Sequence, residues 1–312
     1  MVADGVRPPG RRRVLKYLEL RGVRVSAIGL GTWQFGSREW GYGSEYAGNE
    51  ATTIVHRALD LGVNLIDTAE VYGLGRSESI VGRAIRGRRE SVLLATKIFP
   101  IGLPFMIGWR ARASARRLGV DRIDLYQQHW PSPLFTPRAT MLRMRRLVQD
   151  GLVAHVGVSN HTLQAWQGCE EALGMPVLSN QVLFSLAHRD PERDLVPWAQ
   201  EKGRIVIAYS PLGQGALSGK YQDAAPKNFR RMRRNFTAEG RVRLAPVVAA
   251  LREIGGRHDA TPAQVALAWL IRKPNVVAIP GASSVHQLEE NVAAADIELS
   301  DDDASRLDSL SE

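Results

Sequence analysis

Eight short apolar segments recur at similar intervals along the chain and constrain its fold more than any other feature of the sequence. They are rich in β-branched residues, and turn-forming residues bound each of them. Runs that are apolar almost throughout are typical of parallel strands that are buried on both faces. The eight segments cover residues 26–33, 63–69, 92–98, 122–129, 154–160, 177–182, 205–212 and 276–281.

Amphipathic stretches separate these segments and predict a helix after each strand. The spacing of apolar residues in two of them is clearly helical, with Ile54, Val55, Ala58 and Leu59 in one and Ile80, Val81, Ala84 and Ile85 in the next. Between residues 26 and 281 each strand and its helix take about 32 residues, which is typical of a closed barrel and not of an open sheet. We therefore predict an α/β protein with a (β/α)8 TIM-barrel fold.

Three additions to a plain barrel are predicted. Residues 17–25 alternate around Arg21-Gly22 and predict a hairpin that caps the bottom of the barrel. The interval between the seventh and eighth strands, 213–275, is about twice the usual length and predicts a long functional loop that includes the basic run 227–234. A last helix should begin at the Ser300 cap, with acidic residues in its first turn.

The net charge of +9 is concentrated in two segments, 1–24 and 220–243, so the remaining chain is near neutral when it is counted along the sequence. That distribution disfavours a nucleic-acid-binding protein. We predict a disordered basic tail over residues 1–16 and a single barrel domain over 17–312. Cys169 is the one cysteine, which predicts a reducing, cytoplasmic location. No apolar run is long enough for a membrane span, and no residue spacing indicates a metal site.

Polar residues stand where the predicted strands end, which is where barrel enzymes place their active sites. Asp67 and Tyr72 follow the second strand, Lys97 ends the third, and His129 ends the fourth. Each alone has an ordinary explanation, such as a helix cap or a buried core histidine. Four such residues on neighbouring strands, all directed at one cavity, indicate an active site.

These segments resemble the aldo-keto reductase superfamily over residues 18–310. The resemblance rests on motifs in the family's order, which here read NLIDTAEVYG (64–73), ATK (95–97), RRLGVDRIDLYQQHWP (116–131), GVSN, NQV, YSPLGQGALSGKY and IPGASSVHQLEEN. It implies an NAD(P)H-dependent reductase of aldehydes or ketones. In that interpretation Tyr72 is the proton donor, Lys97 lowers the pKa of Tyr72, Asp67 keeps Lys97 charged, and His129 orients the carbonyl.

The resemblance also implies a binding site for a nicotinamide cofactor. Ser159, Asn160 and Gln181 would bind the carboxamide and Tyr209 would stack on the ring, while glycines in 210–217 would allow the pyrophosphate to approach the backbone. The complete predicted set is Thr32, Trp33, Ser159, Asn160, Gln181, Tyr209, Ser210, Pro211, Leu212, Gly213, Gly215, Leu217, Lys220, Gly281, Ser283, Gln287, Glu290 and Asn291.

NADPH is the expected cofactor, and NADH is the alternative. Many NADPH-using relatives have an Arg or Lys in the segment that holds the 2′-phosphate, whereas residues 281–291 contain neither here. Lys220, Lys227 and the arginines of 230–234 are candidates for the missing positive charge. The substrate pocket should be aromatic, with Trp33, Phe99 and Trp130, which favours apolar or aromatic carbonyl compounds.

The apolar segment 98–109 has two interpretations, either as a wall of the substrate pocket or as an exposed surface that binds a partner. The expected partner is a small carbonyl substrate, without nucleic acid or membrane, and the expected state is a monomer or small homo-oligomer. The chain lacks the complete glycine pattern of a dinucleotide-binding fold or of a P-loop. The alternative function is a cofactor-binding regulatory subunit that resembles channel β-subunits and has little turnover.

Overall fold

The computed structural model describes residues 15–36, 49–221, 224–226 and 229–311. Its main sheet contains eight parallel strands in the order of the chain. Bridges pair Ile28 with Ala278 and Gly31 with Gly281, so the first strand region lies against the last and the sheet closes. The predicted barrel is confirmed, with strands β3 (Leu30–Gly31), β4 (Leu65–Asp67), β5 (Leu93–Ile98), β6 (Ile123–Gln128), β7 (Val153–Ser159), β8 (Ser179–Leu183), β9 (Ile205–Tyr209) and β10 (Val276–Ala278).

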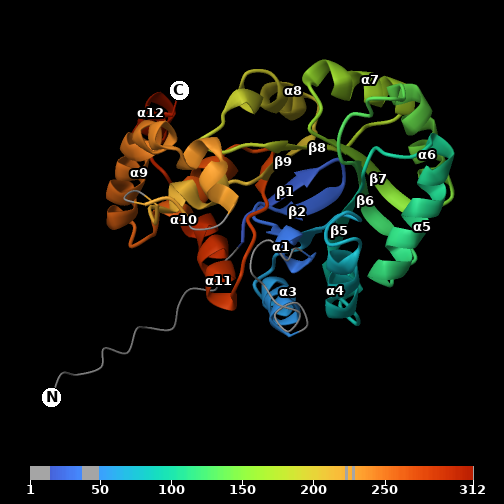
Figure 1. The fold of residues 1–312 in the computed structure, drawn as a ribbon, viewed down its shortest axis with the longest axis horizontal. Coiled ribbons are helices and arrows are strands. Elements are labelled where there is room, and N and C mark those ends of the chain that lie inside the picture. The colour runs from blue at the N-terminus through green and yellow to red at the C-terminus, as the bar shows by residue number, and fades with distance from the viewer. Residues whose placement is uncertain (1–14, 37–48, 222–223, 227–228, 312) are drawn as a thin grey trace.

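Helices form a layer outside the sheet (Figure 1). The apolar stripe predicted around Ile54 is buried on the first long helix. The helices are α1 (Trp33–Gly36), α3 (Glu50–Asp60), α4 (Arg76–Ala84), α5 (Ile107–Leu118), α6 (Pro137–Gln149), α7 (Leu163–Leu173), α8 (Leu195–Glu201), α9 (Ala238–Arg257), α10 (Pro262–Ile271), α11 (Val285–Ala293) and α12 (Asp301–Leu310). Short 3-10 helices join them: η2 (Arg89–Ser91), η3 (Pro104–Met106), η4 (Asp190–Glu192), η5 (Gly213–Ser218), η6 (Phe229–Met232), η7 (Arg234–Phe236) and η8 (Ala294–Asp296).

The predicted hairpin consists of β1 (Tyr17–Leu20) and β2 (Val23–Ser26), paired antiparallel. Arg21 and Gly22 form its turn with φ of 53° and 76°. The Tyr17 hydroxyl donates to the carbonyl of Gly62 at 2.6 Å, just before β4 begins. The hairpin therefore covers the end of the barrel at which the strands start, as predicted.

The chain is packed from slightly earlier than the predicted boundary at residue 17. Leu15 is buried, and the ammonium of Lys16 donates to the carbonyl of Ile271 at 2.8 Å. Both residues contact the barrel because the hairpin brings them to its lower end. The rest of the predicted tail, residues 1–14, lies outside the described residues.

The interval between β9 and β10 differs from the long loop predicted there. Its first part contains η5, η6 and η7, but α9 and α10 occupy most of 238–271. The extra length is therefore largely an additional helix packed on α10. Lys227, one of the predicted cofactor cations, lies outside the described residues.

The last helix begins as predicted, because the Ser300 hydroxyl accepts a hydrogen bond from the Asp303 amide at 3.1 Å. In the described ranges no helix has the length and apolar character that crossing a bilayer requires. Nor do three His, Cys, Asp or Glu side chains gather there in a way that could hold a metal ion.

Candidate active site

The centre of the site is the ammonium of Lys97, which is fully buried at the end of β5. Its Nζ donates to Asp67 Oδ2 at 2.5 Å, to the Thr68 carbonyl at 2.8 Å and to Tyr72 Oη at 3.3 Å. Register positions these groups, because Asp67 ends β4 and pairs with Ala95 on the neighbouring strand. The structure thus brings three of the four predicted catalytic residues into direct contact.

The charge of Lys97 is maintained by Asp67. Burial lowers the pKa of Lys97, but Asp67 and then Tyr72 outweigh that effect and leave the pKa above its usual value. Asp67 Oδ1 in turn accepts from the amides of Gln181 at 2.7 Å and Gln127 at 3.3 Å. Gln127 was not among the predicted residues, although a polar residue inside an apolar strand is a sequence signal for it.

The pKa of Tyr72 corrects one expectation from the sequence. Burial raises the pKa of this phenol, and the opposing effect of the Lys97 ammonium is smaller. The pKa therefore lies above its usual value, not below it. Tyr72 is fully protonated at neutral pH, which is the form that can donate a proton.

His129 lies beside Tyr72, with ring centroids 5.9 Å apart in an edge-to-face arrangement. Its amide donates to the Ile98 carbonyl at 2.9 Å, which ties it to the end of β5. Burial, and after it the charge of Lys97, lowers the pKa of His129 from 6.5 to about 3. The imidazole is therefore neutral at physiological pH and can act as a hydrogen-bond donor without carrying a charge.

Glu70 is a further residue of this site that the sequence analysis missed. Its carboxylate accepts from the amide of Phe99 at 2.7 Å and from Arg110 Nε at 3.2 Å. The Phe99 ring packs edge-on against His129, with centroids 5.9 Å apart. Glu70 therefore joins the loop that carries Tyr72 to the aromatic side of the pocket. Its position in the segment NLIDTAEVYG was the only sequence signal.

Predicted cofactor residues form a polar cluster next to these groups. The Tyr209 hydroxyl donates to Asn160 Oδ1 at 2.9 Å, and Asn160 Nδ2 donates to the Ser159 hydroxyl at 3.0 Å and to the His129 carbonyl at 3.1 Å. The hydroxyl of Ser159 donates to the carbonyl of Gln181 at 2.8 Å. One connected set of hydroxyls and amides therefore extends from the Asp67 carboxylate to Tyr209.

The chain after Tyr209 turns repeatedly. Ser210, Gly213, Gln214 and Gly215 all have positive φ, which brings the backbone of η5 and its glycines close to the end of β9. The remaining predicted contacts of this segment are Pro211, Leu212, Leu217 and Lys220; Leu217 is fully buried and Lys220 is exposed.

The segment after β10 is held in place by its own side chains. A Cβ at Gly281 would lie 2.3 Å from the amide oxygen of Gln34, so a larger residue there would require the Gln34 side chain to move. The Gln287 side chain accepts from the amide of Ser283 at 2.7 Å, and Asn291 Nδ2 donates to the Gly281 carbonyl at 3.3 Å. Glu290, another predicted contact, lies 3.8 Å from His286 on α11.

Other predicted residues lie at the edges of the site. The Thr32 hydroxyl is buried and donates to the Asp67 carbonyl at 2.9 Å, so it already has a partner inside the barrel. Trp33 and Phe99 are half-buried, and Trp130 is 45% exposed. A narrow cleft of about 20 Å³ runs beneath Phe99 and the segment 98–104.

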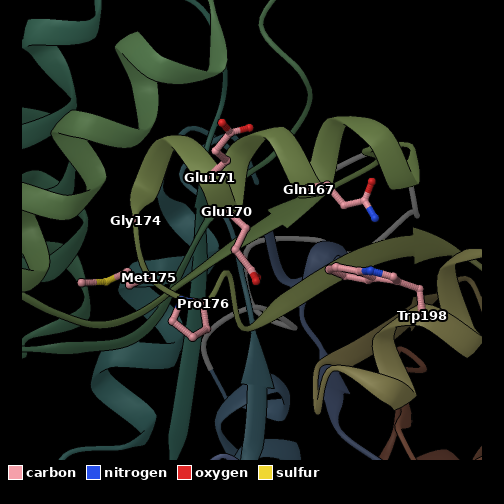
Figure 2. Close-up of a pocket in the computed structure, with 7 residues that line it drawn as sticks. All are labelled: Gln167, Glu170, Glu171, Gly174, Met175, Pro176 and Trp198. Atoms are coloured by element: carbon pink, nitrogen blue, oxygen red, sulfur yellow. The ribbon is translucent and has the colours of Figure 1, made fainter.

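A larger cavity of about 400 Å³ lies elsewhere, between α7 and α8 (Figure 2). Trp198, Met175 and Glu170 line it, and residues 174–176 precede β8, so it opens at the lower end of the barrel. The Glu170 carboxylate is already occupied by Arg204 Nε at 2.9 Å and the Val177 amide at 3.0 Å. The convergence of reactive groups, and not cavity size, therefore makes the group around Lys97 the candidate active site.

Comparisons with known proteins concern the family and the fold of the chain. The model of the aldo/keto reductase family matches residues 27–312. The chain is 56% identical over 289 residues to an uncharacterized oxidoreductase of Mycobacterium tuberculosis, covering 92% of this chain and 90% of that protein. It is 34% identical to the methylglyoxal reductase YeaE of Escherichia coli, covering 92% and 91%.

A crystal structure of an aldo/keto reductase from Klebsiella pneumoniae, in complex with NADP and acetate, matches the fold with a TM-score of 0.78 and 33% identity. The match covers 95% of each chain. The chain therefore belongs to the aldo/keto reductase family and is an NAD(P)H-dependent oxidoreductase.

Proposed function

We propose that the protein reduces an aldehyde or ketone carbonyl with NADPH, and that Tyr72 is the proton donor. The observation that carries this proposal is the buried contact of Lys97 Nζ with both Asp67 Oδ2 and Tyr72 Oη. A phenol is a weak acid in water, but an ammonium held at 3.3 Å stabilises the phenolate that forms when the proton leaves. Asp67 keeps that ammonium charged throughout.

His129 has a separate role in this proposal. Because its imidazole is neutral, an N–H of the ring can donate a hydrogen bond to the carbonyl oxygen without competing with Tyr72 as an acid. The Nδ1 atom is buried and has no hydrogen-bond partner among the described residues. A buried nitrogen without a partner is less destabilising as an unprotonated acceptor than as an unsatisfied N–H donor. We therefore expect the ring proton on Nε2.

The residues beside this group fit a nicotinamide cofactor. The cluster of Ser159, Asn160 and Gln181 offers hydroxyl and amide groups that suit a carboxamide, and Tyr209 offers an aromatic face. The glycine-rich turns of 213–215 and the glycine at 281 allow close approach of a phosphate-containing group. When bound, the reduced cofactor supplies the hydride.

The Klebsiella pneumoniae relative was crystallised with NADP, which supports NADPH for this protein. Residues 281–291 contain no Lys or Arg for a 2′-phosphate. Arg231, Arg233 and Arg234 are exposed after η5 and are our candidates for that charge. If these arginines bind the 2′-phosphate, NADPH should bind more tightly than NADH at low salt. The variant Arg231→Gln/Arg233→Gln/Arg234→Gln should then bind the two cofactors equally. Equal affinities in the wild type contradict this assignment.

The catalytic proposal is tested by mixing the purified protein with NADPH and methylglyoxal, then with other aldehydes, ketones and quinones, and following oxidation of the cofactor. Methylglyoxal is the first choice because the Escherichia coli relative is named for its reduction. Tyr72→Phe should lower turnover by about 10²-fold or more, the loss expected for a general acid, with cofactor affinity nearly unchanged.

Tyr126→Phe is the matched control, because this phenol is also buried and its hydroxyl has no partner among the described residues. It should retain turnover. A fully active Tyr72→Phe variant refutes Tyr72 as the acid. Tight NADPH binding without turnover on any carbonyl compound supports the regulatory alternative instead.

A further inference from the structure

The surface formed by η3, α5 and α6 exposes an unusual number of large apolar side chains. Of the eleven such side chains exposed in the described part of the chain, seven lie between residues 101 and 142. The most prominent group stands at the start of α5, where Ile101 is 61% exposed, Leu103 49%, Phe105 66% and Trp109 62%. Clusters of this kind on a single protein mark interaction surfaces.

The same region carries a strong positive charge. Residues 91–149 contain ten basic and only two acidic residues, a net charge of +8 in a chain whose total is +9. Acidic residues elsewhere in the chain offset this charge, so the part of the chain outside 1–24 and 220–243 is near neutral as a whole. Four of the basic side chains are buried or occupied in the fold: Lys97 with Asp67, Arg110 with Glu70, Arg117 with Glu78, and Arg145 with the Leu173 carbonyl.

The exposed arginines lie on adjoining helix stripes. Trp109, Arg112 and Arg116 follow one another at helical spacing on α5, and all are exposed. On α6 the exposed stripe consists of Arg138, Leu142 and Arg146, with Arg143 beside it.

The two stripes meet at Asp150. Its carboxylate lies 3.0 Å from Arg146 and 3.9 Å from Arg112. Figure 1 shows α5 and α6 side by side on one edge of the barrel. We call this surface, with its apolar cluster 101–109 and its arginines, the basic apolar face.

We propose that the basic apolar face docks the protein on an anionic lipid surface. Arginines attract acidic headgroups, while Phe105 and Trp109 are the side chains that enter the boundary between headgroups and acyl chains. The four large apolar side chains of the cluster are 49% to 66% exposed, and the cleft lined by residues 98–104 has a volume of only about 20 Å³. A projecting aromatic cluster suits a lipid surface, whereas a protein partner's anchor needs a pocket.

The proposal does not depend on the reaction. The arginines of the face lie on the outer side of α5 and α6, and none contacts Asp67, Tyr72, Lys97 or His129. It also needs no membrane-spanning helix, because peripheral binding uses exposed side chains of a folded protein.

The test is cosedimentation of the full-length protein with vesicles. We expect binding to phosphatidylcholine vesicles that contain about one third phosphatidylglycerol, weaker binding as salt rises, and none to phosphatidylcholine alone. The variant Arg116→Gln/Arg138→Gln/Arg143→Gln should lower the partition coefficient by roughly 100-fold, because each basic side chain near an anionic surface contributes a factor of about five. Circular dichroism and the melting temperature establish that the variants are folded.

The control variant Arg21→Gln/Arg86→Gln/Arg193→Gln makes the same change of net charge at exposed arginines in the turn of the hairpin, just after α4 and just after η4. It should bind as the wild type does. Equal weakening of both triple variants overturns the proposal, since it would show attraction by net charge alone. Absence of wild-type binding to the anionic vesicles also overturns it.

The apolar part is tested with Phe105→Ser/Trp109→Ser, which should bind anionic vesicles at least tenfold more weakly. Its control, Met232→Ser/Val242→Ser, removes two apolar side chains elsewhere that are even more exposed, and it should bind as the wild type does. If Phe105→Ser/Trp109→Ser binds anionic vesicles as tightly as the wild type does, insertion of these two side chains into the lipid surface is contradicted. Tighter binding to soluble polyglutamate or duplex DNA than to the vesicles overturns the proposal in favour of a soluble acidic partner.

Discussion

The charge of Lys97 depends on one carboxylate, so Asp67→Asn should expose the cost of a buried ammonium. Asp67 Oδ2 lies 2.5 Å from Lys97 Nζ, and their side chains are 3% and 0% exposed. The remaining contacts of the ammonium are the neutral Thr68 carbonyl and Tyr72 hydroxyl. Without the carboxylate, burial becomes the dominant influence on Lys97 and lowers its pKa.

The loss of stability has an upper bound that depends on pH. In the folded variant Lys97 can remain a buried, unpaired cation, which lowers the stability by about 3 to 5 kcal/mol. Alternatively, Lys97 can release its proton. Deprotonating a lysine whose pKa is about 10.4 costs roughly 4.6 kcal/mol at pH 7 and roughly 2 kcal/mol at pH 9, at about 1.4 kcal/mol for each pH unit. Once the proton is released, the destabilisation should shrink by that slope as the pH rises.

The sign follows from proton counting. In the wild type the pKa of Lys97 is raised above its unfolded value, so its stabilising contribution is complete below the unfolded pKa and is lost only as pH rises through the folded pKa. Between about pH 6 and pH 9 that contribution is constant. Where the folded variant has released the proton, the unfolded chain binds one proton more than the folded chain, so the stability of the variant rises with pH.

Urea unfolding of both proteins across this pH range, followed by tryptophan fluorescence, measures the difference. Asp124→Asn is the control, because this carboxylate accepts from the Leu94 amide at 2.7 Å and pairs with Arg89. An arginine does not titrate in the range, and Asp124 otherwise influences His155, whose pKa lies below its usual value, so that difference should be flat above about pH 7. A flat difference for Asp67→Asn as well would refute the assignment of Lys97 as a buried cation held by Asp67.

Three further predictions concern the same architecture. Arg110→Met should cost about 2 to 3 kcal/mol of stability and should lower kcat, because it leaves the Glu70 carboxylate, which holds Phe99, without its ion pair. Arg204→Met is the control, because Arg204 forms a comparable pair with Glu170. It should cost as much stability and leave kcat unchanged in the same assay. His129, with a pKa of about 3, should give no break in kcat/KM between about pH 5 and pH 7, and a break near 6.5 would contradict the neutral imidazole. Gly82→Ala should lower the free energy of unfolding by about 1 to 3 kcal/mol, because a Cβ there would lie 2.5 Å from the Leu118 carbonyl oxygen. Gly168→Ala on α7, where the added Cβ meets open space, should raise it by about 0.5 to 1 kcal/mol. Thermal unfolding measures both changes.

The strands and most helices could be predicted from the sequence because their signals are local. Each strand is an apolar run between turn residues, and α12 begins at a serine whose hydroxyl caps the helix. The helix α9 was not predicted. It contains Pro246 and the pair Gly255 and Gly256, which favour a break, but Leu251 and Ile254 are buried where it packs on its neighbours. Tertiary contacts outweighed the local preference.

The sequence by itself determined which chemical groups meet at the mouth, because parallel strands in a closed barrel end at one edge and Asp67, Lys97 and His129 stand at those ends. Only the tertiary structure decided their ionisation. Burial outweighs Lys97 in setting the pKa of Tyr72, and the amount of burial depends on residues far apart in the chain.

The composition of the exposed surface was also decided by the tertiary structure. The charge of residues 91–149 can be counted along the chain, but which of its arginines are buried, paired or exposed on the basic apolar face depends on the fold. The Glu70 contact with Arg110 was equally invisible, since forty residues separate the two. A pattern in sequence records what each segment can bury, whereas a pKa or a binding surface depends on distances between segments.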